Sequence, residues 1–309
     1  MKLCVIGGAG ARSAFLTKSL VKSAREIRVD HIVLLDNNEE HLRTYGQISK
    51  ELARRMEPSL TFDITSDARG ALTGADYIIT TIRAGGDAGR LFDEKTCLAH
   101  GVLGQETTGA GGFAMAIRSV PTLVYYCTLA REVSNPGHLI FNFTNPSGII
   151  TQALRSCGFA NVYGICDAPS GFIKQLEEIL NVPYGALDIE CYGLNHLSWF
   201  RNAKLDGRDV QEELLNNPRT YQHSEMRLFT REMARLSGEC MLNEYLYFYY
   251  RREKSLSMVQ KAEHPRGEMI YLINRELETQ LAQMELPRDF EKAFNLYMNA
   301  YGKRENAYF

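Results

Sequence analysis

The stretch VIGGAGARS at residues 5–13 decides the fold of this chain. It follows the apolar run of residues 2–6 and opens a segment whose apolar residues have helical spacing. Gly8, Gly10 and Ser13 fit the pattern G-x-G-x-x-G of dinucleotide-binding folds, with serine in place of the third glycine. Such glycines let a diphosphate approach the backbone, and the following helix N-terminus stabilises its charge. The motif predicts a strand, a tight turn and a helix around a nucleotide.

A second apolar run at residues 31–35 ends in Asp36. An acidic side chain at this place accepts hydrogen bonds from the adenosine ribose of NAD and repels the 2′-phosphate of NADP. A glycine turn without a ligand is the alternative explanation of the motif. The strand, the helix and Asp36 together favour an NAD site.

Short β-branched runs alternate with longer helical segments as far as residue 165. Further strands are expected at residues 60–64, 77–82, 138–143 and 161–165, and helices at 39–56, 113–133 and from about 146. This alternation predicts an α/β fold with a Rossmann-like, doubly wound parallel sheet over residues 1–165. Residues 166–309 contain a short strand, a hairpin at 202–210 and mostly helical sequence. We expect them to form a second, α+β domain that carries metal and substrate groups.

The composition excludes several classes of protein. The 35 basic and 37 acidic residues give a net charge of −2, whereas a nucleic-acid-binding protein needs a basic excess. Seven cysteines spread from Cys4 to Cys240 are typical of free thiols in a reducing compartment. No apolar run approaches the roughly 18–20 residues of a membrane span, and no signal peptide precedes the first strand. We therefore expect a cytoplasmic globular protein with neither a nucleic-acid nor a membrane partner.

Three polar segments follow strands of the expected sheet, at the edge where open α/β sheets bind ligands. They are residues 82–86 (IRAGG) with Arg90 beyond them, residues 104–112 (GQETTGAGG) and residues 142–146 (NFTNP). Each segment alone fits ordinary turn chemistry. Three of them at one sheet edge predict a binding site.

Cys166 and His196 each follow an expected strand. A thiolate and an imidazole suit a borderline divalent metal, and two protein ligands leave positions open for substrate oxygens. An isolated cysteine or histidine is more often a packed residue, so the spacing leaves both explanations open.

The strings IGGAG, TIRAGG with a following Arg90, GQETTGAGG, NPSGI, GICDAP and GLNHLSWF, in this order, resemble glycoside hydrolase family 4. The resemblance runs from Met1 to at least Tyr250. It implies an NAD- and divalent-metal-dependent glycosidase, most like the 6-phospho-β-glucosidases. A 6-phospho-α-glucosidase or a glycosidase for non-phosphorylated sugars of the same family remains open, and we favour the β anomer of a 6-phosphoglucoside.

The resemblance implies roles for residues that match the family. Cys166 and His196 would hold the metal, usually Mn²⁺, and Asp167 would protonate the leaving group. Tyr245 would be the catalytic base, with Tyr249 as the weaker alternative. Asn145 and Asn195 would bind sugar hydroxyls. Arg90, together with Ser13 or Arg83, would face the substrate and its phosphate, and Arg83 is also expected to contact the cofactor.

The implied reaction is a sequence of redox, elimination and addition steps on the sugar. NAD⁺ oxidises C3, a base removes the C2 proton, the aglycone leaves from C1, water adds, and hydride returns to C3. A metal ion would polarise the ketone as a Lewis acid. This route needs no pair of carboxylates. A tyrosine base needs positive charge nearby, because free tyrosine has a pKa of about 10.

Two other functions stay open from the sequence. A plain NAD-dependent dehydrogenase would need a histidine–acid pair and a substrate arginine in the second half, which we do not find. An inactive, truncated NAD- or sugar-phosphate-binding protein is the other, because 309 residues fall short of the family norm and leave a second domain that is shorter than usual. We also expect a homodimer or a homotetramer.

Overall fold

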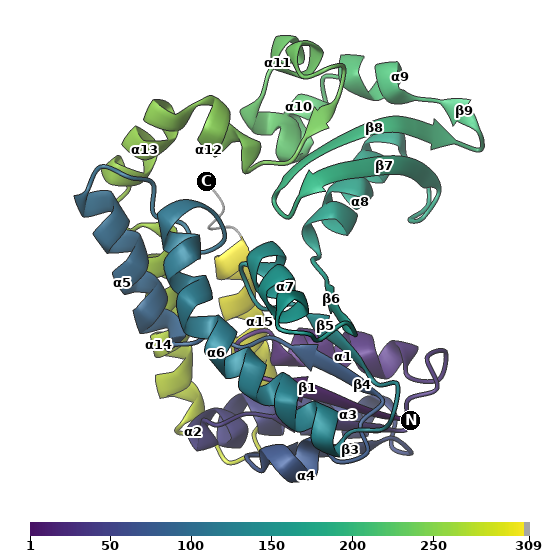
Figure 1. Cartoon of the computed structure of the whole chain (residues 1–309), viewed down its shortest axis with the longest axis vertical. Helices are drawn as coiled ribbons and strands as arrows, with labels where there is room; N and C mark the ends of the chain where they lie inside the picture. The colour runs from purple at the N-terminus through teal and green to yellow at the C-terminus, as the bar shows by residue number, and fades with distance from the viewer. Residues whose placement is uncertain (306–309) are drawn as a thin grey trace. The chain divides into compact units, whose positions relative to one another are not determined.

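The computed structural model describes residues 1–305, and the chain divides into two compact units. Unit 1 comprises Met1–Ala99, Gly104–Ile165 and the described residues from Ala262 onward. Unit 2 comprises His100–Leu103 and Cys166–Lys261. Figure 1 follows the chain from the purple strands of unit 1 through the green elements of unit 2 to the yellow helices.

Unit 1 is built on a six-stranded parallel sheet of order β3-β2-β1-β4-β5-β6. Its strands are β1 (Lys2–Ile6), β2 (His31–Leu35), β3 (Thr61–Thr65), β4 (Tyr77–Thr80), β5 (Leu139–Asn142) and β6 (Val162–Gly164). The chain runs outward from β1 to β3 and then returns to β4, so the winding direction reverses between β1 and β4. This order confirms the expected Rossmann-like, doubly wound sheet.

Helices cover both faces of the sheet, which is why its central strands are continuous apolar runs. The helices of this part of the chain are α1 (Ser13–Ser23), α2 (Glu39–His41), the short π-helix η1 (Leu42–Gly46), α3 (Gln47–Met56), α4 (Ala68–Leu72), α5 (Gly86–Ala99), α6 (Gly109–Val133) and α7 (Ser147–Ser156). Of these, α1 and α3 pack on one face of the sheet, and α4, α6 and α7 pack on the other. Cys4 of β1 packs on one face with Leu123 of α6, and Val5 packs on the other with Val21 of α1. Alternate residues of each strand therefore enter separate cores.

Helix α6 is long and apolar enough to cross a membrane by length and composition, a criterion that core helices also meet. Leu123, Cys127 and Ala130 of α6 are buried in the core against the sheet. The expectation that no segment reaches this length and hydropathy is wrong. Packing on the sheet accounts for the apolar side of the helix.

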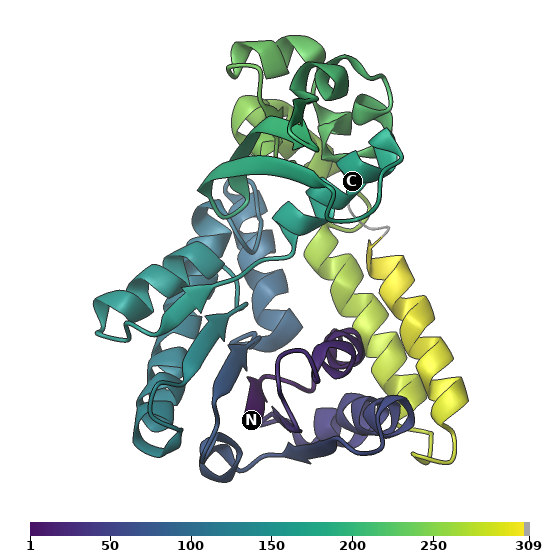
Figure 2. The same cartoon turned by 90° about the vertical axis from the view of Figure 1, so that its right-hand side faces the viewer.

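The last two helices of unit 1 come from the end of the chain. They are α14 (Arg266–Leu281) and α15 (Phe290–Glu305), drawn in yellow-green and yellow in Figure 2. Leu277 and Tyr297 share a core with Tyr45 and Ile48 of the segment that follows β2. The expected second domain of residues 166–309 is thereby corrected. Unit 2 begins at Cys166 apart from the short segment His100–Leu103, but α14 and α15 contribute buried apolar side chains to a core of unit 1.

Unit 2 is an α+β body built on a small antiparallel sheet. β7 (Leu187–Leu194) pairs with β8 (Leu197–Leu205), which also pairs with β9 (Arg208–Asp209) and β10 (Met241–Leu242). The helices are α8 (Ala168–Leu180), α9 (Gln211–Asn216), α10 (Thr220–His223), the 3₁₀ turn η2 (Glu225–Leu228), α11 (Arg231–Leu236), α12 (Leu246–Tyr250) and α13 (Arg252–Lys261). Phe172 of α8 meets Phe200 of β8 edge-on inside its core. The expected hairpin at 202–210 is the β8–β9 connection.

Candidate active site

A cavity of about 570 Å³ in unit 1 opens beside residues 7–13, the glycine loop between β1 and α1. We call it the glycine-loop cavity. It lies where the winding of the sheet reverses, the place where open α/β sheets bind ligands. All five residues predicted to contact the cofactor line it, namely Gly8, Gly10, Ser13, Asp36 and Arg83.

The glycine loop is shaped by close packing on one side and is open on the other. A Cβ at Gly8 would lie 2.9 Å from the carbonyl oxygen of Val5 and 3.0 Å from Cβ of Leu34, so a side chain does not fit there. At Gly10 a Cβ would meet only the carbonyl oxygen of Gly7, at 3.8 Å. Gly10 therefore leaves the backbone accessible to a ligand, as a dinucleotide site requires.

Ser13 begins α1, and its hydroxyl oxygen is buried without a hydrogen-bond partner in the structure. The first backbone N–H groups of a helix also lack intrahelical partners and attract anions. An unpartnered hydroxyl at the start of an eleven-residue helix, on the wall of a cavity, fits a phosphate oxygen.

Asp36 is fixed at the edge of the glycine-loop cavity by the backbone. The N–H of Ala9 donates to Oδ2 of Asp36 at 3.2 Å, and the N–H of Asn38 donates to Oδ1 at 3.0 Å. Each carboxylate oxygen can accept more than one hydrogen bond. The carboxylate therefore retains the capacity to accept bonds from ribose hydroxyls.

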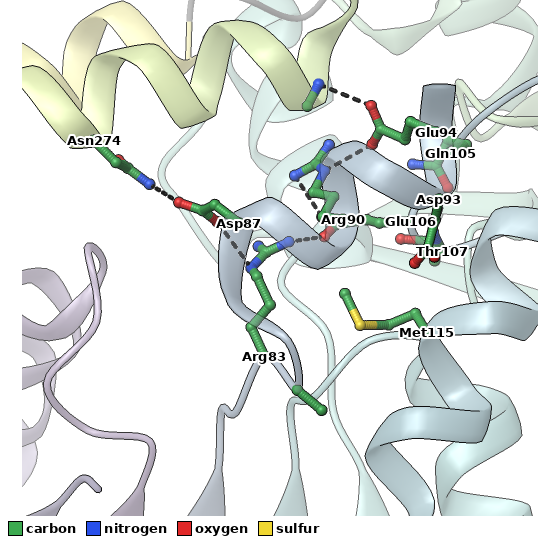
Figure 3. A network of polar contacts seen from close by, with 12 residues as sticks. Arg83, Asp87, Arg90, Asp93, Glu94, Gln105, Glu106, Thr107, Met115 and Asn274 are labelled. Atoms are coloured by element: carbon green, nitrogen blue, oxygen red, sulfur yellow. Dashed lines mark hydrogen bonds and ion pairs between the residues drawn. The ribbon is translucent and has the colours of Figure 1, made fainter. Parts of the chain in front are cut away.

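The two arginines predicted after β4 lie in a network of ion pairs (Figure 3). Arg83 donates to Glu106 and lies 3.3 Å from Asp87. Arg90 donates to Glu94 at 2.7 Å and lies 3.1 Å from Glu106. Burial alone would raise the pKa of Glu106, but the arginine charges lower it to about 2. Glu106 is therefore a carboxylate at neutral pH.

The positions of Arg83 and Arg90 differ in access to ligands. Arg83 lines the glycine-loop cavity, whereas the side chain of Arg90 is only 2% exposed and does not line it. The guanidinium of Arg90 lies between the carboxylates of Glu94 and Glu106. Its contact with a substrate phosphate stays a prediction.

Of the three polar segments expected at one binding edge, only one lines the glycine-loop cavity as a whole. Residues 82–86 line it, residues 142–146 contribute Phe143, and residues 104–112 contribute nothing. Asn145, predicted to contact the sugar, lies half-buried between β5 and α7. Three glycines of this segment, Gly104, Gly111 and Gly112, serve close packing, since a Cβ at Gly104, for example, would lie 2.3 Å from the carbonyl oxygen of Glu94.

The predicted metal, acid and base residues gather in unit 2. Sγ of Cys166 lies 3.5 Å from Nε2 of His196 and 3.9 Å from Oδ1 of Asp167. The imidazole of His196 stacks on the ring of Tyr245, with centroids 4.5 Å apart and planes 22° from parallel. We call these four residues the Cys166 cluster. Their roles stay predictions, but the structure brings them together.

Local backbone geometry positions His196. It occupies the tight connection between β7 and β8 with a left-handed φ of 55°, a conformation in which histidine is enriched among non-glycine residues. Gly193 precedes it with a φ of 121°, and a Cβ there would lie 2.4 Å from the carbonyl oxygen of Leu197. The turn therefore depends on a glycine three residues before the histidine.

The Cys166 cluster fits a divalent metal by its donors. It offers a thiol and an imidazole, a set suited to borderline transition metals. Among the described residues no group of three or more His, Cys, Asp or Glu side chains could hold a metal, so Cys166 and His196 are the ligands predicted within this part of the chain. Next to His196, Oδ1 of Asn195 is buried without a hydrogen-bond partner in the structure. Asn195 was predicted to bind a sugar hydroxyl, which would supply that partner.

The two tyrosines predicted as alternatives for the catalytic base differ in their surroundings. Tyr245 is buried against His196, whereas Tyr249 is 51% exposed. The backbone of Tyr245 is held by Oδ1 of Asn243, which accepts its N–H at 3.2 Å. Asn243 in turn donates to Glu225 at 2.9 Å.

Sequence reasoning missed the residues that the C-terminal helices bring to the glycine-loop cavity. These are Asn274 and Glu278 of α14 and Arg304 of α15. No motif marks them, because their position depends on the packing of α14 and α15 on elements more than two hundred residues earlier. Glu106 lies within the GQETTGAGG segment, but its ion pairs with Arg83 and Arg90 become visible only in the folded structure.

Comparisons with known proteins identify the family of this chain. Residues 2–182 match the model of the family 4 glycosyl hydrolases, and residues 191–308 match the model of their C-terminal domain. The 6-phospho-beta-glucosidase BglT of Thermotoga maritima is 30% identical over 297 residues, which is 94% of this chain and 69% of that protein. The phospho-alpha-glucosidase PagL of Clostridium acetobutylicum is 32% identical over 267 residues, 80% of this chain and 59% of that protein.

A structural relative contains the expected ligands. The 6-phospho-beta glucosidase of Thermotoga maritima, solved with manganese, NAD⁺ and glucose-6-phosphate, superposes with a TM-score of 0.81 at 30% identity. The match covers 98% of this chain and 72% of that one. Since the two family models together match most of its residues, this chain belongs to family 4 of the glycosyl hydrolases.

Proposed function

We propose that this chain hydrolyses a 6-phosphoglucoside, with the β anomer favoured, and that it uses NAD⁺ and a divalent metal ion, Mn²⁺ first. The observation that carries the proposal is the Cys166 cluster, where a thiol, an imidazole, a carboxylic acid and a buried tyrosine meet. Relatives named for activity on β- and α-linked phosphoglucosides support the substrate class.

Two sets of residues would hold the required groups. Gly8, Gly10, Ser13, Asp36 and Arg83 line the cavity that suits NAD⁺, and Cys166 with His196 would hold the metal. When bound, NAD⁺ accepts and returns a hydride, and the metal acts as a Lewis acid on sugar oxygens.

The side chains of the Cys166 cluster would move the protons. Tyr245 takes the proton from C2 of the sugar, and its stacking on His196 fixes the ring for that transfer. Asp167 gives a proton to the oxygen of the leaving group. Asn145 and Asn195 would bind sugar hydroxyls. A direct bond from Arg90 to the 6-phosphate requires its ion pairs with Glu94 and Glu106 to open.

We also propose that the protein is cytoplasmic and forms a homodimer or a homotetramer. All seven cysteines are free thiols, which suits a reducing compartment. Phe113, Ile117 and Tyr125 are large apolar side chains of α6 that are exposed, which supports association between copies.

A substrate series tests the activity. The chain is assayed with p-nitrophenyl α- and β-glucosides, each with and without a 6-phosphate, and with NAD⁺ and Mn²⁺ supplied or withheld. We expect release from the 6-phospho-β substrate only when both are present, with deuterium from D₂O entering at C2 and no net NADH. Full activity in EDTA after NAD⁺ is stripped contradicts the proposal.

Two other outcomes identify the alternatives. Net NADH formation from a 2-hydroxy acid supports a plain dehydrogenase. Binding of NAD⁺ without turnover of any glycoside supports a binding protein, an option kept open because the chain spans between 59% and 72% of the relatives described above.

A further inference from the structure

Helix α15 contributes an arginine to the glycine-loop cavity. Arg304 lines the cavity together with Arg12 and Arg83, although it is only 9% exposed. Its Nη1 donates a hydrogen bond of 3.3 Å to the carbonyl oxygen of Ala11. Ala11 belongs to the glycine loop, so the guanidinium lies directly against the segment that should hold a diphosphate.

Within the part of the chain that the structure describes, Arg304 forms no salt bridge, and its bond to Ala11 is to a neutral group. Burial lowers the pKa of Arg304, and the charge of Arg12 lowers it further. A buried cation is costly unless an anion pairs with it. The surroundings of Arg304 therefore call for a negative group.

The acidic side chains of the cavity are already engaged. Asp87 lies 3.3 Å from Arg83 and accepts a hydrogen bond from Asn274. Glu278 lies 3.2 Å from His41. Asp36 accepts two backbone N–H groups. None of these carboxylates pairs with Arg304 in the structure.

The start of α1 provides independent evidence for an anion at the same place. The hydroxyl of Ser13 is buried, 5% exposed for the residue, lines the cavity and has no hydrogen-bond partner in the structure. The helix N-terminus favours an anion by its dipole and its N–H groups. The N-terminus of α1, the hydroxyl of Ser13 and the guanidinium of Arg304 thus all lie beside the glycine loop.

We propose that Arg304 binds the diphosphate of the dinucleotide, so that the C-terminal helix completes the cofactor site. The inference rests on the NAD⁺ site of the proposed function and extends it. A guanidinium donates through several N–H groups in one plane, so the bond to Ala11 leaves others for phosphate oxygens. The same chemistry would also accept the phosphate of a sugar phosphate, and the test separates the two.

Calorimetric titrations with ADP, adenosine and glucose 6-phosphate test the assignment on the full chain. Arg304→Gln removes the charge, and Lys303→Gln removes a charge from the exposed neighbouring position of the same helix. We expect Arg304→Gln to bind ADP about tenfold to hundredfold more weakly, since bonds to charged groups have this strength. Adenosine affinity should be unchanged, and Lys303→Gln should match the unaltered protein.

Other outcomes overturn the assignment at different levels. Equal ADP affinity in Arg304→Gln and the unaltered protein removes Arg304 from the site while leaving the NAD⁺ proposal intact. A loss confined to glucose 6-phosphate assigns Arg304 to the sugar phosphate instead. Failure of the unaltered protein to bind both ADP and NAD⁺ rejects the cofactor site itself, and Arg304's role with it. If Arg304→Gln does not fold, Arg304→Lys gives the same comparison, with ADP binding weakened less but still selectively.

Discussion

The residues of the Cys166 cluster are placed by a strand end, a tight turn and ring stacking. Cys166 follows β6 after one residue, and His196 is fixed by the left-handed turn between β7 and β8. Tyr245 completes the cluster through ring stacking. The cluster can therefore be altered one functional group at a time without disturbing an extended element.

Replacing Tyr245 with phenylalanine tests the proposed base. The ring can still stack on His196, so the change removes only the hydroxyl. We expect kcat to fall by about 10²–10⁴, the usual contribution of a general base, with little change in KM. Tyr249→Phe, on an exposed residue, is the matched control. Steady-state kinetics with the 6-phospho-β substrate measures both, and an unimpaired Tyr245→Phe contradicts the assignment.

Glu225 should make the stability of the protein depend on pH. Burial and the charge of Glu244 raise the pKa of Glu225 to about 8. An unfolded chain releases this proton near pH 4.5, so between pH 4.5 and 8 the native state binds more protons. The free energy of unfolding therefore falls as pH rises through this window.

Glu225→Gln removes that dependence and keeps an acceptor for the backbone N–H of Glu244. Urea unfolding at pH 5 and pH 8 should show the unaltered protein losing about 1–4 kcal/mol more than the variant over this range. Parallel losses in the two proteins would show that the pKa of Glu225 is not raised in the native state.

At the scale of elements, the motif GQETTGAGG links helices through ion pairs and close packing. Its Glu106 pairs with Arg83 and Arg90, and Arg90 also pairs with Glu94. Glu94 accepts the backbone N–H of Gly267 at 2.9 Å, at the start of α14. A carboxylate at a helix N-terminus is favourable. One network thus connects α5, the loop that follows it and α14 (Figure 3).

The close packing of the GQETTGAGG segment predicts that a larger residue at Gly104 destabilises the protein. Gly104→Ala would bring a Cβ to 2.3 Å from a backbone oxygen of α5, which cannot rotate away. We expect a loss of about 1–3 kcal/mol in the free energy of unfolding. Gly171→Ala in α8, where a Cβ meets nothing within 4 Å, should be neutral or stabilising by up to about 1 kcal/mol. Similar urea midpoints for the two variants would contradict the packing argument.

At the scale of the whole molecule, the features that local sequence patterns encode could be predicted, whereas those that depend on long-range packing could not. All six strands of the parallel sheet form within two residues of their expected bounds, because strand pattern and turn chemistry are encoded locally. The glycine loop, Asp36 and the Cys166 cluster were likewise marked by motifs. The return of α14 and α15 to unit 1, and with it Arg304, could not be predicted because an amphipathic helix does not specify which body it packs on.

The division into two units makes the two ligand sites separable. The predicted metal ligands Cys166 and His196 belong to unit 2, and the residues of the glycine-loop cavity belong to unit 1. Cys166→Ser should weaken Mn²⁺ binding at least about tenfold, since serine is a poor ligand for such a metal, and leave NAD⁺ affinity within a factor of about two. Paramagnetic resonance of Mn²⁺ and calorimetry with NAD⁺ measure the two affinities, and Cys157→Ser, on an exposed cysteine, is the control. A parallel loss of both ligands would mean that the sites depend on each other, whereas intact Mn²⁺ binding would remove Cys166 from the metal site.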